Sequence, residues 1–150
     1  MDRDAVLKLS KQPTFLLYAC ARETTKYYRP YITRMGLTYT QYLTMLALWE
    51  HGEMNMKALG EALYLDSGTL TPVLKKLEKK GYITRTRDCR DERNLILRLT
   101  EKGIALKEPV FEITKEMAAW EPLTREQNAE LYALLGEALA RYGEKTREKD

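Results

Sequence analysis

The chain has 150 residues and a formal net charge of +3, with 44% hydrophobic and 31% charged residues. These values are typical of one folded domain with a full core, and they exclude a disordered or fibrous chain. No apolar run approaches the roughly 18 residues that a membrane-spanning helix needs. The N-terminus also lacks the basic-then-apolar order of a signal peptide, so we expect a cytoplasmic protein.

Residues that carry chemistry are few. Cys20 and Cys89 are far apart, His51 is the only histidine, and no metal-ligand spacing surrounds them. The sequence has no Gly-rich phosphate loop, nucleophile elbow or paired-carboxylate pattern. We therefore expect no enzyme, no metal site and no cofactor. A small enzyme that uses Cys20 or His51 is the weakest alternative.

The first predicted helix covers roughly Asp4 to Tyr28 and includes the run FLLYACA, which is apolar on every side. A helix of this kind is buried from several directions, and in a small chain a partner subunit supplies that cover. We therefore place Phe15 and Leu16 in a dimer interface. Pro30 predicts the end of this helix, because the residue before a proline is pushed out of the helical region.

Two short helices are predicted next. Thr38 and Gln41 have the capping-box spacing that opens a helix over about Tyr39 to His51. Asn55 is a candidate N-cap for a second helix over Met56 to Leu63.

A basic helix follows. Asp66 is its candidate N-cap, and Gly81 marks its end. A proline deep inside a helix costs about 3 kcal/mol, so Pro72 favours an effective start near Thr69. Two helices joined by a few residues form the helix-turn-helix pattern.

The basic helix has two different faces. Its apolar residues recur at the i, i+3, i+4, i+7 spacing of a buried face, in Leu70, Val73, Leu74 and Leu77. The opposite face carries hydroxyls, lysines and few bulky groups, which suits a helix in a DNA major groove. The residues that this spacing assigns to the DNA-facing surface are Pro72, Lys75 and Lys79, flanked by Thr71 and Lys76.

Two strands are predicted after this helix, over Tyr82 to Arg87 and Asn94 to Leu99, and the charged turn DCRDER separates them. A helix-turn-helix followed by a hairpin is a winged helix. We assign a DNA-contacting role to the charged residues of this wing, namely Arg87, Arg90, Asp91 and Arg93.

Charge is concentrated in the same region. Residues 75–98 contain nine basic and four acidic side chains, a net charge of +5, whereas the remainder of the chain carries −2. Such a patch suits a polyanion, whose counterions are released on binding. A solvated lysine-rich helix is the alternative interpretation of the KKLEKK run.

The C-terminal part is predicted to be helical. One helix runs from Thr100 to about Trp120 with an interruption near Pro109, and the Thr124–Gln127 spacing caps a last helix. The last helix has a long apolar stripe, which we assign to a dimer interface. The interface residues from this stripe are Leu131, Leu134, Leu135 and Leu139.

The predicted fold is mainly α with a small β-hairpin wing. The chain forms one domain over residues 1–150, with a winged helix-turn-helix lobe over 37–99. Residues 4–36 and 100–147 form dimerisation helices that intertwine in a homodimer. Such a dimer suits a pseudo-palindromic operator in double-stranded DNA.

The motifs FLLYACARETTKYYRP, LTYTQYLTMLALWEH, LGEALYLDSGTLTPVLKKLEKKGYITR and DERNLILRLTEKG resemble the MarR family, and within it the organic-hydroperoxide-resistance regulators. The resemblance covers about Gln12 to Gly143. It implies a winged-helix homodimer that represses transcription and leaves its operator when a chemical signal arrives. It also implies that Arg93 is the wing-tip arginine, with Asp91 paired to it. The residues that it places in the major groove are Ser67, Thr69, Thr71, Pro72, Lys75 and Lys76.

The sequence departs from that group at the sensor. The resemblance implies a reactive cysteine in a Q-x-C-F context, but this chain has Gln12-Pro13-Thr14-Phe15. Thr14 cannot form a thiolate and therefore cannot be oxidised to a sulfenic acid. Tyrosines that the resemblance places around the cysteine are present as Tyr28 and Tyr39.

We interpret this region as a site for a small aromatic or amphiphilic effector, with hydroxyls from Thr14, Tyr18, Tyr28 and Tyr39. Tyrosines that only pack the dimer interface are the alternative. Two further functions stay open, namely a hydroperoxide-responsive repressor that uses Cys20 and a nonspecific DNA-binding protein.

Overall fold

The computed structural model describes residues 7–87, 94–118 and 122–147. The chain divides into two compact units, Met1–Met117 and Ala118–Asp150, which are described separately. The elements of the first unit are η1 (Leu9–Lys11), α2 (Pro13–Arg34), α3 (Tyr39–His51), β1 (Met54–Asn55), α4 (Met56–Leu63), α5 (Ser67–Lys79), β2 (Ile83–Arg87), β3 (Leu95–Leu99), α6 (Glu101–Ala105) and α7 (Lys107–Ala118). The second unit contains α8 (Arg125–Arg147).

The three strands form one antiparallel sheet in the order β1-β3-β2. β2 and β3 pair along their whole length, from Ile83 opposite Leu99 to Arg87 opposite Leu95. This hairpin confirms the predicted wing strands to within one residue. β1 adds a short edge strand, with Met54 opposite Leu97. This strand was not predictable from the sequence, because two residues show no alternation.

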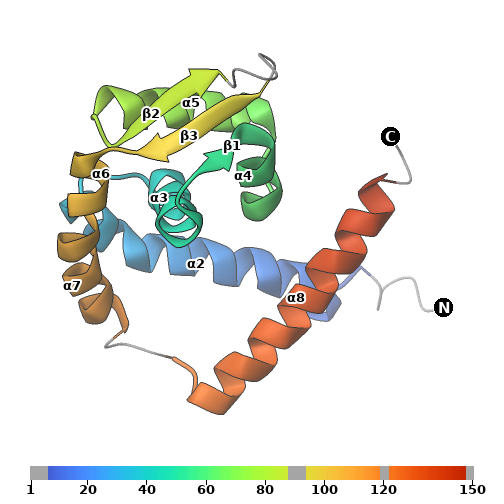
Figure 1. The fold of residues 1–150 in the computed structure, drawn as a ribbon. Coiled ribbons are helices and arrows are strands. Elements are labelled where there is room, and N and C mark those ends of the chain that lie inside the picture. Colours follow the sequence, from blue (N-terminus) through green and yellow to red (C-terminus); the bar gives the residue numbers. More distant parts are fainter. Residues whose placement is uncertain (1–6, 88–93, 119–121, 148–150) are drawn as a thin grey trace. The chain divides into compact units, whose positions relative to one another are not determined.

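The core of the first unit lies between α3, α4, α5 and the sheet. Figure 1 shows α3 between α2 and the strands, with α4 and α5 beside it. The side chains that are fully covered there are Met45, Leu48, Leu59, Leu70, Leu74, Leu77 and Leu97. With α4 and α5 as the helix-turn-helix and β2–β3 as the wing, the predicted winged helix is confirmed.

Local caps define the two short helices before α5. The Thr38 hydroxyl accepts from the Gln41 amide at 3.3 Å, and the Gln41 side chain accepts from the Thr38 amide at 3.1 Å. The Asn55 side chain accepts from the Ala58 amide at 2.7 Å. These caps satisfy backbone donors that have no partner within the helix. Accordingly, α3 and α4 cover the ranges predicted from the sequence.

The prediction that the first helix ends before Pro30 is wrong. α2 continues through Pro30 to Arg34 and ends in a left-handed Gly36. Pro30 lies on the exposed side of the helix, where water can solvate the carbonyl that loses its amide donor. The residues beyond it are held by packing, because Ile32 and Met35 are buried in the core.

The prediction that Pro72 belongs to the first turn of a helix starting near Thr69 is also wrong. α5 begins at Ser67, so Pro72 lies inside it. The ring at position 72 faces the backbone of Gly68, and both residues are exposed. Water can therefore solvate the Gly68 carbonyl, which loses its amide donor, and the N-cap at Asp66 extends the helix toward its N-terminus.

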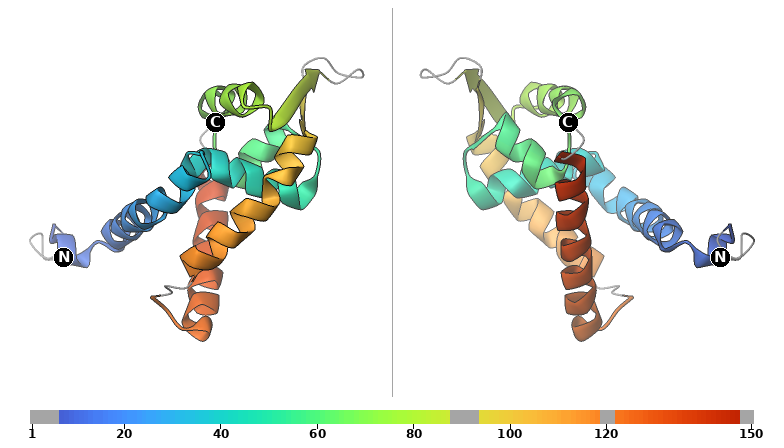
Figure 2. Two further views of the ribbon diagram at one scale, coloured as in Figure 1. Left: turned by 90° about the vertical axis from the view of Figure 1, so that its left-hand side faces the viewer. Right: turned by 90° about the vertical axis from the view of Figure 1, so that its right-hand side faces the viewer.

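The N-terminal half of α2 lies outside this core. Figure 2 shows it extending away from the other elements of the first unit. Leu16 and Tyr18 are 63% and 62% exposed there, although the segment is apolar on every side. Among the described residues, no helix combines the length and apolar character that crossing a membrane requires.

The second unit is a capped helix with an uncovered apolar stripe. The Thr124 amide donates to the Gln127 side chain at 2.9 Å, and the Gln127 amide donates to the Thr124 hydroxyl at 3.3 Å, which confirms the predicted cap. Leu131, Leu134 and Leu139 are exposed along this helix, and Leu135 is half-buried.

Candidate nucleic-acid interface

α5 presents the face that the sequence predicted. Its inner residues Leu70, Leu74 and Leu77 are fully buried. On the outer side, the exposed residues are Ser67, Thr69, Pro72, Lys75, Lys76 and Lys79, and Thr71 is half-buried. One helix therefore brings seven of the predicted DNA-contacting residues to a single surface.

The N-terminal end of this surface is fixed by Asp66. Its carboxylate accepts from the Thr69 amide at 2.8 Å and from the Thr69 hydroxyl at 3.0 Å. These two hydrogen bonds hold the pKa of Asp66 below its ordinary value, and the bond from the Thr69 amide has the larger effect. The Thr71 hydroxyl likewise donates to the Ser67 carbonyl at 2.7 Å. The hydroxyl protons of Thr69 and Thr71 are therefore both donated within the helix. Toward a base edge, these two side chains offer their hydroxyl oxygens as acceptors and their methyl groups for apolar contact.

Not all of the basic residues of this region face outward. The Arg85 guanidinium donates to Glu78 at 2.9 and 2.6 Å, and Arg98 pairs with Glu53 and also donates to the Thr86 hydroxyl at 3.0 Å. Glu78 is already included in the charge of +5 counted for residues 75–98, whereas Glu53 is not, so the Arg98–Glu53 pair neutralises one of those positive charges within the lobe.

The lysines at the C-terminal end of α5 also differ in whether they bond to other parts of the lobe. Lys80 donates to oxygens of other elements. Within the part of the chain that the structure describes, Lys75, Lys76 and Lys79 have no ion pair. These three ammonium groups are exposed on the outer face of α5. The internal roles of Arg85, Arg98 and Lys80 were not predictable from the sequence, because their partners lie on other elements and leave no periodic signal.

The wing is described only in part. Arg87 is the last residue of β2 and is exposed. The other predicted wing contacts, Arg90, Asp91 and Arg93, lie outside the described residues, as does Cys89.

The structure brings two of the four predicted effector-site residues close together. The rings of Tyr28 on α2 and Tyr39 on α3 lie 6.4 Å apart. Burial is the main cause that raises the pKa of Tyr39 above its ordinary value, and the neighbouring Tyr28 and Tyr42 raise it further. The Tyr39 phenol is therefore neutral near pH 7. Thr14 and Tyr18 are exposed further along α2, and at 1.5 Å per residue Tyr18 is ~15 Å from Tyr28. One subunit alone does not assemble all four hydroxyls.

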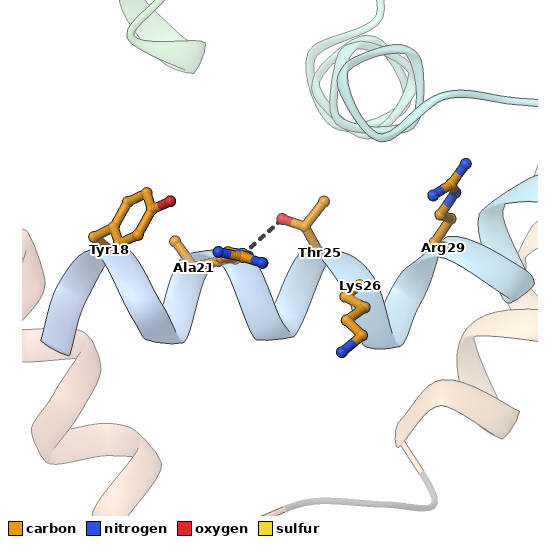
Figure 3. A pocket seen from close by; sticks show the side chains of 6 residues that line it. Tyr18, Ala21, Thr25, Lys26 and Arg29 are labelled. Atoms are coloured by element: carbon orange, nitrogen blue, oxygen red, sulfur yellow. Dashed lines mark hydrogen bonds between the residues drawn. The ribbon is translucent and has the colours of Figure 1, made fainter. Parts of the chain in front are cut away.

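A shallow groove follows one face of α2 next to Tyr18. Its lining comes from this helix alone, and the residues are Tyr18, Ala21, Arg22, Thr25, Lys26 and Arg29. Figure 3 shows Tyr18, Thr25 and Arg29 on one side of the helix, and the Thr25 hydroxyl donates to the Ala21 carbonyl at 2.8 Å. A groove on a single helix does not enclose a ligand.

Other chemistry is sparse in the described ranges. Cys20 is an exposed free thiol on α2. Residues 7–87, 94–118 and 122–147 contain no group of three or more histidine, cysteine, aspartate or glutamate side chains that could hold a metal ion.

Comparison with known proteins agrees with this geometry. A family model described as transcriptional regulator SarA/Rot matches residues 26–110. The organic hydroperoxide resistance transcriptional regulator of Bacillus subtilis (strain 168) is 52% identical over 107 residues, which cover 71% of this chain and 73% of that protein. The regulator SarZ of Staphylococcus aureus (strain USA300) is 52% identical over 106 residues, 71% of this chain and 72% of that protein.

A solved structure extends the comparison over nearly the whole chain. The crystal structure of AbfR of Staphylococcus epidermidis superimposes with a TM-score of 0.79 at 32% identity, covering 96% of this chain and 99% of that one. Reduced AbfR has also been solved bound to DNA. These relatives are regulators and not enzymes. The chain therefore belongs to the SarA/Rot family of MarR-like winged-helix transcriptional regulators.

Proposed function

We propose that this regulator is a homodimer that recognises a pseudo-palindromic operator through the outer face of α5 and acts as a repressor. The observation that carries the proposal is the division of α5 into a fully buried leucine face and an exposed hydroxyl and lysine face. The major groove of DNA is wide enough to admit an α-helix such as α5. The small polar residues at the N-terminal end of α5 could then approach base edges.

Roles follow from position on the helix. Ser67, Thr69 and Thr71 lie in the first turns and are assigned to base edges, where Pro72 leaves room for close approach. Lys75, Lys76 and Lys79 are assigned to phosphates. Arg87, together with Arg90, Asp91 and Arg93 of the wing, is assigned to the neighbouring groove.

A second copy of the chain is the proposed cover for the apolar surfaces of the terminal helices. Phe15 and Leu16 of α2 are exposed in one chain, as are Leu131, Leu134 and Leu139 of α8. Exposed apolar stripes of this length mark an interaction site. In a dimer, residues 4–36 and 100–147 would form the interface, and the two α5 helices would read two half-sites.

The proposed signal is a small aromatic or amphiphilic molecule near Tyr28 and Tyr39. The AbfR structures include overoxidized and disulfide forms, and the Bacillus subtilis relative is named for organic hydroperoxide resistance. Here Thr14 stands where the resemblance places the reactive cysteine, and it has no sulfur to oxidise. A bound molecule releases the operator only if it favours one dimer arrangement over the other.

One alternative keeps the redox signal. Cys20 is exposed on α2, six positions after Thr14, and supports a repressor that responds to hydroperoxide through this second cysteine. A nonspecific DNA-binding protein is the other alternative, which the lysines of α5 alone would also allow.

Binding to two duplexes tests the proposal. One duplex contains DNA from upstream of the protein's own gene, and the other is its scrambled counterpart, at the same salt concentration. A specific regulator prefers the first by about 10³-fold or more. A preference near one would support nonspecific binding instead.

The same assay with cumene hydroperoxide, in the absence of reducing agent, distinguishes the signals. We expect wild-type binding to persist, and Thr14→Cys to lose binding until a thiol is added. Loss of binding by the wild type, abolished in Cys20→Ser, would support sensing through Cys20.

A further inference from the structure

The side chain of Lys80 connects the recognition helix to another part of the lobe. Its ammonium group donates to the Gly36 carbonyl and, at 3.4 Å, to the side-chain oxygen of Gln41. Gly36 ends α2, and Gln41 belongs to the cap that opens α3. Lys80 itself is the C-cap residue of α5. One ammonium group thus joins the ends of three helices.

The place of this ammonium group is electrostatically favourable. α2 and α5 end in the same way, with a left-handed glycine and a backbone bond across the last turn, Leu37 to Ile32 in α2 and Tyr82 to Leu77 in α5. The C-terminal end of a helix carries partial negative charge, which attracts a cation. The Gly36 carbonyl that accepts from Lys80 lies one residue past Met35, the C-cap of α2, and so places the ammonium group next to that negative end.

The backbone at the C-terminal end of α5 also accepts hydrogen bonds from side chains at the start of α6. The Lys102 ammonium donates to the Lys80 carbonyl at 2.8 Å and lies 5.1 Å from the centre of the Tyr82 ring. The Thr100 hydroxyl donates to the Gly81 carbonyl at 2.6 Å. The C-terminal end of α5 is therefore attached to α6 by its backbone and to the α2–α3 junction by the Lys80 side chain.

Lys80 differs from its neighbour on α5. Lys79 is exposed and has no ion pair within the described residues, whereas Lys80 is half-buried and has two of its three donors engaged. A phosphate contact by Lys80 would require both bonds to break.

We propose that Lys80 is a positioning residue for DNA recognition, which holds α5 at the α2–α3 junction and does not contact a phosphate. α5 has 13 residues and is ~20 Å long. A small tilt at its C-terminal end therefore displaces the first turns, where the proposed base contacts lie. Base contacts depend on this placement more strongly than phosphate contacts do.

Two adjacent substitutions test the assignment, which rests on the proposed function. Lys80→Met and Lys79→Met are compared with the wild type on the upstream and scrambled duplexes over a range of salt concentrations. For Lys79→Met we expect weaker binding to both duplexes and a salt dependence that is flatter by about 0.9, as for one lost phosphate contact. For Lys80→Met we expect an unchanged salt dependence and a specificity ratio lower by about threefold to tenfold, the effect that losing one ordinary hydrogen bond has on an equilibrium.

A conservative variant and a melting curve complete the design. Lys80→Arg keeps a cationic donor that can reach both oxygens, and we expect it to restore the specificity ratio. The ratio is measured well below the melting temperature, so a loss of stability alone does not change it. If Lys80→Met does not fold, Lys80→Gln retains a donor without charge and is expected to keep the wild-type salt dependence.

The outcomes separate the two proposals. A salt dependence that flattens in Lys80→Met or Lys80→Gln as it does in Lys79→Met would overturn the positioning role and make Lys80 a phosphate contact. An unchanged specificity ratio in Lys80→Met would also overturn it. A wild-type specificity ratio near one would overturn the proposed function and the positioning role together.

Discussion

The winged-helix lobe and α8 differ in the exposure of their apolar side chains. In the lobe, Leu74 and Leu97 are 0% exposed, because α3, α5 and the sheet of the same chain cover them. In α8, Leu131 and Leu134 remain 42% and 59% exposed. Both regions have amphipathic patterns, so a pattern shows which face needs cover without showing which chain provides it. The core of the lobe is covered within one chain, whereas α8 keeps an apolar face exposed that the proposed dimer would cover.

The largest expected effect is a loss of stability in the lobe. Leu74→Ala should lower the free energy of unfolding by about 2–5 kcal/mol, because it leaves a cavity in a closed core. The same substitution in α8, Leu134→Ala, serves as the matched control. Its effect on chemical denaturation should depend on protein concentration, since the side chain would be covered only on association. Equal, concentration-independent losses in both variants would contradict the comparison.

Association is the next property to test. Leu134→Lys places a charge in the stripe and should shift the dimer toward monomers in sedimentation measurements. Ala140→Lys adds the same charge on the opposite side of α8, as the helical repeat of 3.6 residues places it, and should leave association unchanged. If both variants remain dimeric at low micromolar concentration, the stripe is not the interface.

A smaller effect is expected for a lysine on the outer face of the lobe. Lys75→Ala should weaken binding to the upstream duplex and lower the slope of log affinity against log salt concentration by about 0.9. Lys107→Ala, on α7, removes an exposed lysine outside the lobe and should leave that slope unchanged. A wild-type slope in Lys75→Ala would mean that α5 presents a different face to DNA.

The smallest effect concerns an exposed ion pair between α2 and α7. Arg34 donates to Glu116 at 2.6 and 3.1 Å, and this partner holds the pKa of Glu116 below its ordinary value of 4.5. A lowered pKa in the folded state contributes stability above pH 4.5 that disappears as the pH falls through the lowered value.

Melting temperatures of the wild type and Glu116→Gln should therefore differ slightly at pH 7 and converge as the pH falls below the lowered pKa of Glu116. The difference at pH 7 stays small because water screens both side chains. Glu112→Gln, which removes a pair within α7 itself, is the matched control for the contact between helices. A difference that grew as the pH fell would contradict this account.

Locally determined features were predictable from the sequence. The Thr38–Gln41 and Asn55 caps set the ends of α3 and α4 through bonds over three residues. The division of α5 into two faces followed from the spacing of its leucines. Such signals are contained in one segment and do not depend on the rest of the chain.

Features that depend on distant partners were not predictable. Pro30 does not end α2, because Ile32 and Met35 are held in the core beyond it. Arg98 and Lys80 find their partners 45 and 44 positions away in the chain, so a count of charges overestimates the positive surface. Tyr28 and Tyr39 do meet, but Thr14 and Tyr18 lie further along α2, since a straight helix separates them.

Methylation interference on the upstream duplex tests the central claim most directly, because it reports guanine N7 groups in the major groove. We expect two groups of interfering guanines about one helical turn apart, one for each α5 of the dimer. Thr69→Ala and Thr71→Ala should weaken the dependence on specific bases without removing binding. Interference in a single group, or none at any guanine while binding persists, would contradict recognition by two α5 helices in the major groove.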